Sequence, residues 1–476
     1  MYAGRCNPDG TFSIPGLKPN TRYQLAVWDK PLDNVFGLYD FVTGASPSVN
    51  LGKVPVFNWF GRVAGKVCHD PLATGQCSAN ATGIPGQVVL VLQGGGALGA
   101  YHLGVYEAMH AAGIEPDWVI GTSIGAINAA LIAGNAPENR LPRLREFWQR
   151  MTHKTPWHSG NAWPQLAQSL SFWNTLLNGV PDFFAPNPMA VWGQHHNMGP
   201  ENAGYYSTAP LQKTLRELVD FPRISHCRPR LTVGAAEVET SMMTYFDSQD
   251  MALRVEHIMA SGALPPAFPA VRVGGKLYWD GGILSNTPTE VVFDDYPRRS
   301  SLIFAVHMWN PVGPEPQSLW DVLHRQKDIQ YSSRVANHIT RQLETHRLRH
   351  IIKQLAAHIP EAVRNSEPVK ELASHGCLTR MHVVRLLAPR LEGENHTKDV
   401  DFSPTGIESR WQAGLLNTRE AIRLAPWQGE FDPLDGVILH EPGAGSAGNR
   451  GQTPRPSAAN TPQRFGEGSD PYFSPP

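Results

Sequence analysis

The sequence predicts an α/β fold built on a mostly parallel central sheet. Two apolar runs of strand length, residues 88–92 and 118–120, are each followed by a glycine-containing turn. Apolar side chains then recur at helical spacing over residues 97–112 and 124–133, and Gly113 stands where a helix C-terminus favours a left-handed residue. The order strand, loop, helix, strand, turn, helix is typical of a right-handed crossover over a parallel sheet.

The later elements follow from the same patterns. Residues 231–235 and 301–307 are apolar runs of strand length, and residues 271–280 predict a hairpin that turns at Gly274 and Gly275. Further along, the patterns predict a long polar helix over residues 319–357, a short strand over 382–388 and a final helix over 407–424.

Changes in composition predict four regions. Residues 1–86 are rich in turn residues, with short alternating runs that indicate a small β-rich segment or an irregular polar leader. Residues 87–310 form the predicted α/β domain, and residues 311–440 a mainly helical extension packed on it. Glycine, serine and proline dominate residues 441–476, which we expect to be disordered. The stretch NPDGTFSIPGLKPNTRYQLAVWD near the start weakly resembles the β-sandwich repeats of Cna-B and carboxypeptidase-regulatory-like modules.

Composition excludes several function classes. The 41 lysines and arginines balance 42 aspartates and glutamates, so no net field favours nucleic acid, and we expect no nucleic-acid partner. The most apolar run, residues 126–133, is far shorter than the ~20 residues that cross a membrane, and the first ten residues contain no apolar export segment. We therefore expect a cytoplasmic or peripheral membrane protein. The five cysteines are scattered, so we expect no metal site: Cys6, Cys68, Cys77, Cys227 and Cys377. Cys68 and Cys77 can form a disulfide in an oxidising compartment.

The segment GGGALG, residues 94–99, follows the first strand. It fits a dinucleotide-binding pattern, which needs an acidic residue at the end of the next strand, but Asp117 stands at the beginning of that strand. We therefore expect no nucleotide cofactor. Three successive glycines can also turn their N–H groups toward one point and bind an anion, or form only a tight turn.

The segment GTSIG, residues 121–125, lies between the second strand and the helix that follows. It matches G-x-S-x-G, in which small residues let strand and helix pass closely while the serine side chain stands out of the turn. Ser123 is therefore a candidate nucleophile, and the alternative is an ordinary helix N-cap.

The segment YWDGG, residues 278–282, places Asp280 at the end of a strand. Asp-Gly is commonly a turn, but a shielded carboxylate can also act as the base for a serine. Histidine is the commoner base. The neighbours of His102 indicate ordinary packing, and four other histidines remain open as candidates: His195, His196, His257 and His307.

Together, the three motifs in this order resemble the patatin-like phospholipase family. The resemblance covers residues 87–310, and implies a patatin-like three-layer α/β fold and a Ser-Asp dyad in which Ser123 is the nucleophile and Asp280 the proton acceptor. It places the oxyanion hole on the glycine loop and the residue after the nucleophile: Gly94, Gly95, Gly96 and Ile124. The other motif positions are Gly99, Gly121, Gly125, Gly281 and Gly282. The segment at residues 260–269, ASGALPPAFP, is similar to the loop that precedes the aspartate hairpin.

The C-terminal part is similar to a bacterial subgroup of the family. The similarity lies in the segments RQKDIQYSSR and KDVDFSPTGIESRWQAG. The chain departs from the family in the glycine loop, where many members carry Arg or Lys and this chain has Leu98. The charge that such a residue lends to an oxyanion or a phosphate headgroup is absent, so a preference for phospholipids over neutral acyl esters does not follow.

The resemblance implies a lipid acyl-ester hydrolase that works through an acyl-enzyme and needs no cofactor. The alternatives are a lipid transacylase with the same acyl-enzyme and a non-catalytic lipid-binding protein. The aromatic-rich stretch at residues 148–192 is expected either to line an acyl site or lid at a lipid interface, or to pack on the core. Peripheral membrane contact is expected at the same surface. A basic group in the long helix is expected to touch anionic headgroups or to be a solvated face: Arg334, Arg341, Arg347, Arg349 and Lys353.

Overall fold

The computed structural model describes residues 22–29, 34–42, 83–152, 173–192, 195, 197–391, 394 and 396–442. The chain divides into two compact units, Met1–Thr82 and Gly83–Pro476. In the first unit, β1 (Arg22–Asp29) pairs antiparallel with β2 (Asn34–Val42), as expected of a β-rich segment. The rest of the proposed β repeat, the proposed disordered tail beyond residue 442 and three of the cysteines lie outside the described residues.

The second unit is built on a central sheet that confirms the predicted fold class. Among the described residues this sheet has nine strands in the order β13-β12-β11-β3-β4-β7-β10-β9, with β8 paired to β7. The parallel part comprises β3 (Gln87–Leu92), β4 (Trp118–Thr122), β7 (Arg230–Glu237), β11 (Ser301–His307), β12 (Met381–Leu387) and β13 (Val437–His440). The antiparallel strands are β8 (Met243–Asp247), β9 (Val271–Val273) and β10 (Lys276–Asp280).

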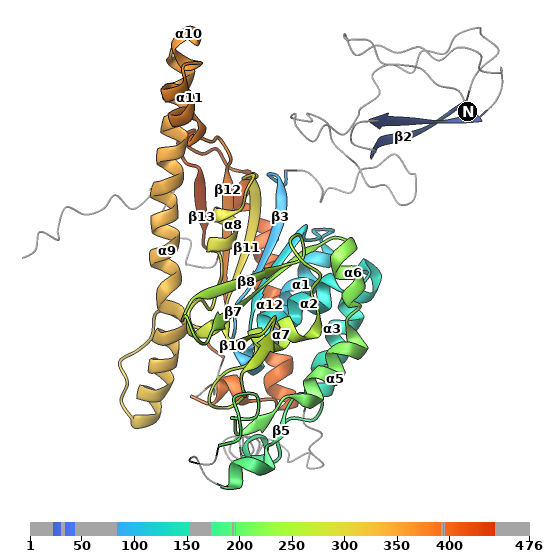
Figure 1. Cartoon of the computed structure of the whole chain (residues 1–476), viewed down its shortest axis with the longest axis vertical. Helices are drawn as coiled ribbons and strands as arrows, with labels where there is room; N and C mark the ends of the chain where they lie inside the picture. Colours follow the sequence, from blue (N-terminus) through green and yellow to red (C-terminus); the bar gives the residue numbers. More distant parts are fainter. Residues whose placement is uncertain are drawn as a thin grey trace, which may run out of the picture. The chain divides into compact units, whose positions relative to one another are not determined.

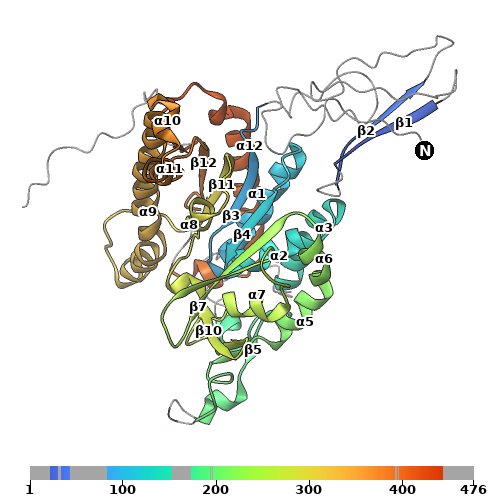
Figure 2. The ribbon, with the colours of Figure 1, turned by 45° about the horizontal axis from the view of Figure 1, so that its top comes forward.

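Helices cover both faces of the sheet and create a three-layer arrangement (Figure 1; Figure 2). Alternate residues of β3 supply the two cores, because successive strand side chains point to opposite faces: Leu90 packs in one core and Val91 in the other. The first core is covered by α1 (Ala100–Ala111), α2 (Ile124–Ala133), α3 (Pro137–Met151) and α12 (Pro404–Leu424). The second is covered by α8 (Glu290–Asp294) and α9 (Leu319–His358).

The remaining helices are shorter. They are α5 (Ala209–Leu218), α6 (Phe221–His226), α7 (Val255–Ser261), α10 (Glu361–Arg364) and α11 (Glu367–Ser374). The helix expected over residues 97–112 is divided, because a short 3-10 turn, η1 (Gly96–Gly99), precedes α1.

The C-terminal region contributes strands to the central sheet as well as packing on it. Strands β12 and β13 extend the sheet beyond β11, and α12 lies along α1. The two helices approach most closely at Gly104 of α1 and Gly414 of α12. A Cβ at Gly104 would lie 2.0 Å from the Trp411 carbonyl oxygen, and one at Gly414 would lie 2.1 Å from the Tyr101 carbonyl oxygen. The C-terminal helix therefore packs backbone to backbone against the helix that follows the glycine loop.

We expect Gly414→Ala to lower the free energy of unfolding by about 1–3 kcal/mol, although alanine favours helix, because the added methyl group must push the α1 backbone away. Urea titration measures this difference. The matched control is Gly262→Ala at the end of α7, where a Cβ meets nothing closer than 3.9 Å. Equal stability of the two variants would contradict the close approach of α1 and α12.

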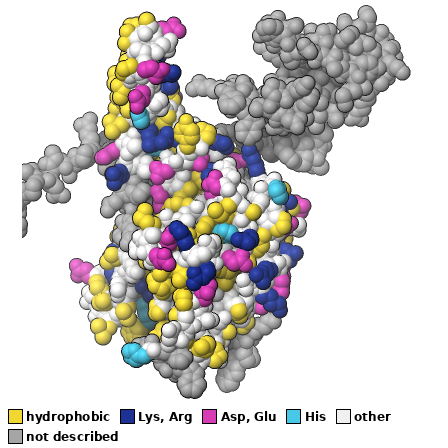
Figure 3. Space-filling model, in the orientation of Figure 1, with side chains coloured by type: hydrophobic (Ala, Val, Ile, Leu, Met, Phe, Trp, Pro, Cys, Tyr) yellow, Lys and Arg dark blue, Asp and Glu magenta, His cyan; other side chains and the backbone are white. Residues whose placement is uncertain are grey.

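The surface carries mixed charges. On the face in Figure 3, acidic and basic side chains are interspersed, and hydrophobic side chains gather on the column formed by α9, α10 and α11. Exposed apolar residues of this column include Leu355, Val363 and Leu372. Within the described part of the chain, each helix is too short or too polar to traverse a lipid bilayer.

Candidate active site

Ser123 occupies a sharp turn between β4 and α2. Its backbone has φ 57° and ψ −127°, a strained conformation for a residue other than glycine. The turn is possible because its flanking residues lack side chains: a Cβ at Gly121 would lie 2.3 Å from the Gly125 backbone, and one at Gly125 would lie 2.1 Å from the Leu92 carbonyl oxygen. Ser123 stands at the N-cap position of α2, yet its side chain makes no capping hydrogen bond. The hydroxyl is therefore available to a partner outside the helix.

The candidate partner is Asp280: the Ser123 side chain interacts with its carboxylate, and this interaction favours the charged form. Asp280 is 2% exposed, and its Oδ1 also accepts the Gly282 N–H at 2.7 Å. Burial raises the pKa of Asp280 from 3.8 to about 6, although both interactions oppose the rise. The carboxyl therefore has a pKa suited to a base near neutral pH.

Asp280 reaches the serine along an antiparallel strand. Strand β7 continues beyond Gly234, its partner of Thr122, to Glu237. Strand β10 starts opposite that overhang and returns until Asp280 pairs with Ala235. Asp280 lies at a strand end, as the sequence predicted. This strand, β10, runs antiparallel to β7 and so brings the carboxylate back toward the serine turn.

Ser261, the last residue of α7, fixes the Ser123 turn through two hydrogen bonds. Its fully buried hydroxyl accepts the Ser123 N–H at 3.0 Å and donates to the Gly234 carbonyl at 2.6 Å. It therefore ties the nucleophile turn to the strand beside Asp280. No motif marks Ser261 in the sequence, although it lies in the segment 260–269 that is similar to the loop before the aspartate hairpin.

We expect Ser261→Ala to lower the free energy of unfolding by about 1–3 kcal/mol, because two buried polar groups lose their partner. We also expect a reduced turnover number, since the strained Ser123 backbone loses a tether. Urea titration and ester-hydrolysis kinetics measure the two effects. Ser261→Thr, which keeps the hydroxyl, is the matched control, and an alanine variant with unchanged stability would contradict the role of this hydroxyl.

The glycine loop lies beside the nucleophile: a Cβ at Gly94 would lie 3.0 Å from the Ser123 Cβ. Gly94 was expected to help bind an oxyanion, but its N–H donates to the Asn286 carbonyl at 3.2 Å. Its own carbonyl accepts two hydrogen bonds, from Asn286 Nδ2 at 3.2 Å and from Trp309 Nε1 at 2.9 Å. Gly94 therefore anchors the loop, and its N–H is already engaged.

Three other candidate donors have no such partner. Among the described residues, the backbone N–H groups of Gly95, Gly96 and Ile124 have no acceptor. Gly96 adopts φ 56°, a left-handed conformation that favours glycine. These three N–H groups are therefore available to an anionic oxygen.

The other motif glycines allow close packing around the site. A Cβ at Gly99 would lie 2.5 Å from Ile124 Cγ1, and one at Gly281 would lie 2.4 Å from the Gly234 carbonyl oxygen. Leu98 is buried in the first core, so the loop position that carries Arg or Lys in many members is an apolar packing position in this chain.

The dinucleotide alternative is not supported at Asp117. Its carboxylate lies before β4, where it accepts hydrogen bonds from the Val88 N–H at 3.0 Å and from Arg228 at 2.9 Å. This is the edge of the sheet opposite to Ser123. Asp117 therefore acts in packing.

None of the described histidines hydrogen-bonds to Ser123. His102 bonds Asn128 Nδ2 at 3.0 Å, and His257 accepts the Arg254 N–H at 2.9 Å. His307 is buried, and desolvation lowers its pKa to about 3. His195 is exposed, and His196 lies outside the described residues. Asp280 is therefore the partner that the structure provides for the serine.

Two residues that no sequence motif marks, Gln93 and Trp309, support the glycine loop through hydrogen bonds. Gln93 is fully buried, and its side chain donates to Thr287 Oγ1 at 2.7 Å and accepts the Trp309 N–H at 3.2 Å. Trp309 lies just beyond β11, after Met308, and packs on Tyr331 of α9, with ring centroids 4.9 Å apart. The only sequence signal for Gln93 is its position next to the glycines.

The aromatic-rich stretch divides into several environments. Trp148 is buried and donates to Asn128 Oδ1 at 3.1 Å, whereas Trp173 is 57% exposed. Phe183 and Phe184 pack against Phe268. Residues 153–172 lie outside the described part of the chain. Packing therefore accounts for part of this stretch.

Two further candidate features are metal ligands and the basic residues of α9. Within the described ranges, no cluster of three or more His, Cys, Asp and Glu residues is suited to a metal ion. Of the basic residues proposed to touch headgroups, Arg349 bonds the His346 ring at 3.0 Å, while the Arg334 side chain is not described.

Comparison with known families gives matches that overlap the site. A family model described as patatin-like phospholipase matches residues 90–293, and a second, DUF3734, described as patatin phospholipase, matches residues 329–434. The first range contains the glycine loop, Ser123 and Asp280, and the second contains most of α9 and α12.

Curated relatives match about half of this chain or less. An uncharacterized NTE family protein of Mycobacterium tuberculosis is 27% identical over 247 residues, which are 50% of this chain and 33% of that protein. A lysophospholipase, NTE1, of Kluyveromyces lactis is 26% identical over 248 residues, 51% of this chain and 14% of the relative. The human patatin-like phospholipase domain-containing protein 6 is 46% identical over 66 residues, 14% of this chain and 5% of the relative.

This chain spans a third or less of the length of these relatives. The two family models match the α/β unit that carries the serine turn and the C-terminal region that extends the sheet. Residues 90–293 therefore form a patatin-like phospholipase domain, and residues 329–434 match a second model described as patatin phospholipase.

Proposed function

We propose that this chain is a serine acyl-ester hydrolase that cleaves fatty acyl esters of lipids through a Ser123–Asp280 dyad. The observation that carries the proposal is the interaction of the Ser123 side chain with a carboxylate that is 2% exposed. The lysophospholipase name of the Kluyveromyces lactis relative supports a lipid ester as substrate.

The proposed reaction proceeds in two halves. Asp280 takes the Ser123 proton as the Oγ attacks the ester carbonyl carbon, and the N–H groups of Gly95, Gly96 and Ile124 bind the resulting oxyanion. When the tetrahedral intermediate collapses, the alcohol leaves with the proton from Asp280, and the acyl group stays on Ser123. A water molecule then gives its proton to Asp280 and attacks the acyl-enzyme, which releases the fatty acid and returns the proton to Ser123.

The apolar loop position bears on the headgroup. Because Leu98 is buried in the core, the glycine loop offers no side-chain cation to a phosphate. We therefore propose that the acyl ester, rather than a phosphate headgroup, is the feature that this loop recognises. Contact with a membrane surface remains part of the proposal.

Lipid product profiling tests this function. Purified wild type and Ser123→Ala are incubated with a lysophospholipid, a diacyl phospholipid or a monoacylglycerol, each with and without an added long-chain alcohol. We expect the wild type to release free fatty acid, and Ser123→Ala to release none above the buffer blank. A wild type that forms mainly the ester of the added alcohol is a transacylase, and one that binds lipid without any product is a lipid-binding protein; either result overturns the hydrolase proposal.

A further inference from the structure

Two ion pairs join α9 to η4 (Lys398–Val400), the short turn that faces the glycine loop. Lys327 of α9 bonds both carboxylate oxygens of Asp399, at 2.7 and 2.9 Å. The next residue, Asp328, accepts Lys398 Nζ at 2.8 Å. A Lys-Asp pair on the helix thus faces a Lys-Asp pair on the turn with complementary charges. We call these four residues the clamp.

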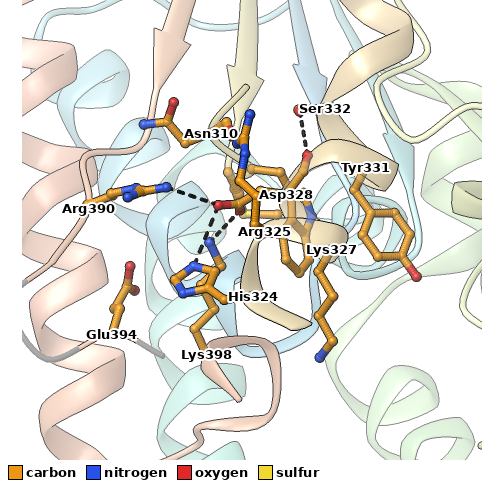
Figure 4. Close-up of polar contacts among 12 residues, drawn as sticks. Asn310, His324, Arg325, Lys327, Asp328, Tyr331, Ser332, Arg390, Glu394 and Lys398 are labelled. Atoms are coloured by element: carbon orange, nitrogen blue, oxygen red, sulfur yellow. Dashed lines mark hydrogen bonds and ion pairs between the residues drawn. The ribbon is translucent and has the colours of Figure 1, made fainter. Parts of the chain in front are cut away.

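The inner half of the clamp is buried. The side chain of Asp328 is 0% exposed and that of Lys398 is 4% exposed, whereas Lys327 and Asp399 are 35% and 21% exposed. Arg390 lies 3.4 Å and His324 3.6 Å from the second Asp328 oxygen, so two cations, Lys398 and Arg390, and an imidazole surround this carboxylate (Figure 4). Desolvation offsets much of the attraction in a buried ion pair, so the pair adds little net stability. The groups that the pair positions explain its presence better.

One end of the clamp reaches the carbonyl of Gly94 through Trp309. The Lys398 ammonium lies 5.0 Å from the centroid of the Trp309 ring, a cation–π contact, and the indole N–H donates to the Gly94 carbonyl at 2.9 Å. A trans peptide holds its N–H antiparallel to its carbonyl. The indole therefore sets the direction of the Gly95 N–H, one of the proposed oxyanion donors.

The other end of the clamp contacts Gly96. A Cβ at Gly96 would lie 2.2 Å from the Asp399 carbonyl oxygen, so the backbone of η4 occupies the space where a side chain would stand. Gly96 is the second proposed oxyanion donor. The two residues of the turn that form ion pairs, Lys398 and Asp399, therefore each act on one peptide of the glycine loop.

We propose that the clamp is a positioning device of the C-terminal region, which orients the Gly95 and Gly96 N–H groups toward the substrate carbonyl oxygen. The inference rests on the proposed hydrolase function. In this account the region matched as DUF3734 is part of the catalytic apparatus, because without η4 and α9 the oxyanion donors lose their support.

The test measures Lys398→Met and Trp309→Phe in the full chain. Each variant is assayed on a short-chain nitrophenyl ester, with rates normalised to the sites that a fluorophosphonate labels, and for affinity to a trifluoromethyl ketone, which forms a tetrahedral adduct with a serine. We expect kcat to fall about 10- to 100-fold with KM changed less than about twofold, since a misplaced oxyanion donor weakens mainly the transition state. Ketone affinity should fall by the same factor as kcat/KM.

If Lys398→Met is unstable because Lys398 is buried, charge reversal at the half-exposed pair, Lys327 with Asp399, provides a second test. Lys327→Asp and Asp399→Lys are each expected to lower kcat about tenfold, and the double variant to recover at least about half of the wild-type value. The matched control is the exposed pair of α11, Lys370 with Glu367, where Lys370→Met should leave kcat unchanged.

The outcomes separate this proposal from the function itself. Variants whose normalised kcat and ketone affinity equal those of the wild type would show that the clamp supports folding alone, and would overturn it. A double reversal that is no more active than the single variants would also overturn it. A wild type that neither hydrolyses esters nor reacts with the fluorophosphonate contradicts the proposed function instead.

Discussion

Ser123→Ala is expected to reduce kcat/KM for a short-chain nitrophenyl ester by on the order of 10⁴-fold or more, because the acyl-enzyme cannot form without the hydroxyl. Stopped-time assays of purified protein measure the loss, and circular dichroism confirms that the variant is folded. Ser285→Ala is a suitable matched control, because Ser285 lies near the site but its hydroxyl bonds Glu290 at 2.5 Å. Retention of more than about a hundredth of the activity in Ser123→Ala would contradict the assignment of the nucleophile.

The pH profile is expected to report the titration of Asp280. The carboxylate form is the base, and burial raises its pKa from 3.8 to about 6. We therefore expect kcat/KM to be constant above about pH 7 and to fall about tenfold per unit below pH 6. A profile that is flat between pH 4.5 and 7 would contradict Asp280 as the proton acceptor.

The same burial has an opposite effect on stability. Because the folded state raises the pKa of Asp280, this group contributes most to stability below pH 3.8, and that contribution is lost as the pH rises through about 6. The shift corresponds to about 3 kcal/mol. Asp280→Asn is uncharged, so we expect it to abolish turnover and yet to raise the free energy of unfolding at pH 8. Reduced stability of Asp280→Asn at pH 8 would show that the charged carboxylate does not destabilise the folded state.

Local patterns in the sequence predicted several strands and helices of the α/β unit, but not α3, α5, α6, α7 or α8. The helix over residues 124–133 and the strand over residues 301–307 are observed with those bounds, because each is a continuous apolar run buried on all sides. Strands β8 and β13 were not predicted. Both lie at positions defined by pairing with distant segments, which no local pattern records.

The candidate site was predictable only in part for the same reason. Ser123 and Asp280 lie in motifs with recognisable neighbours, and the structure brings their side chains together. The residues that hold the motifs in place are remote in sequence: Ser261 bonds a residue 138 positions away, and Trp309 one 215 positions away. A serine and a tryptophan without a motif carry no sign of such partners. The engaged N–H of Gly94 is likewise a consequence of the Asn286 backbone, so the donor set had to be corrected from the structure.

The most direct measurement of the central claim is the mass of the intact protein after exposure to a fluorophosphonate, followed by peptide mapping. The account predicts a single adduct, on the peptide that contains Ser123. Labelling should be lost in Ser123→Ala, and should slow as the pH falls below about 6 because Asp280 becomes protonated. An ester-hydrolysing wild type that is labelled at another residue, or not at all, would contradict the Ser123–Asp280 dyad.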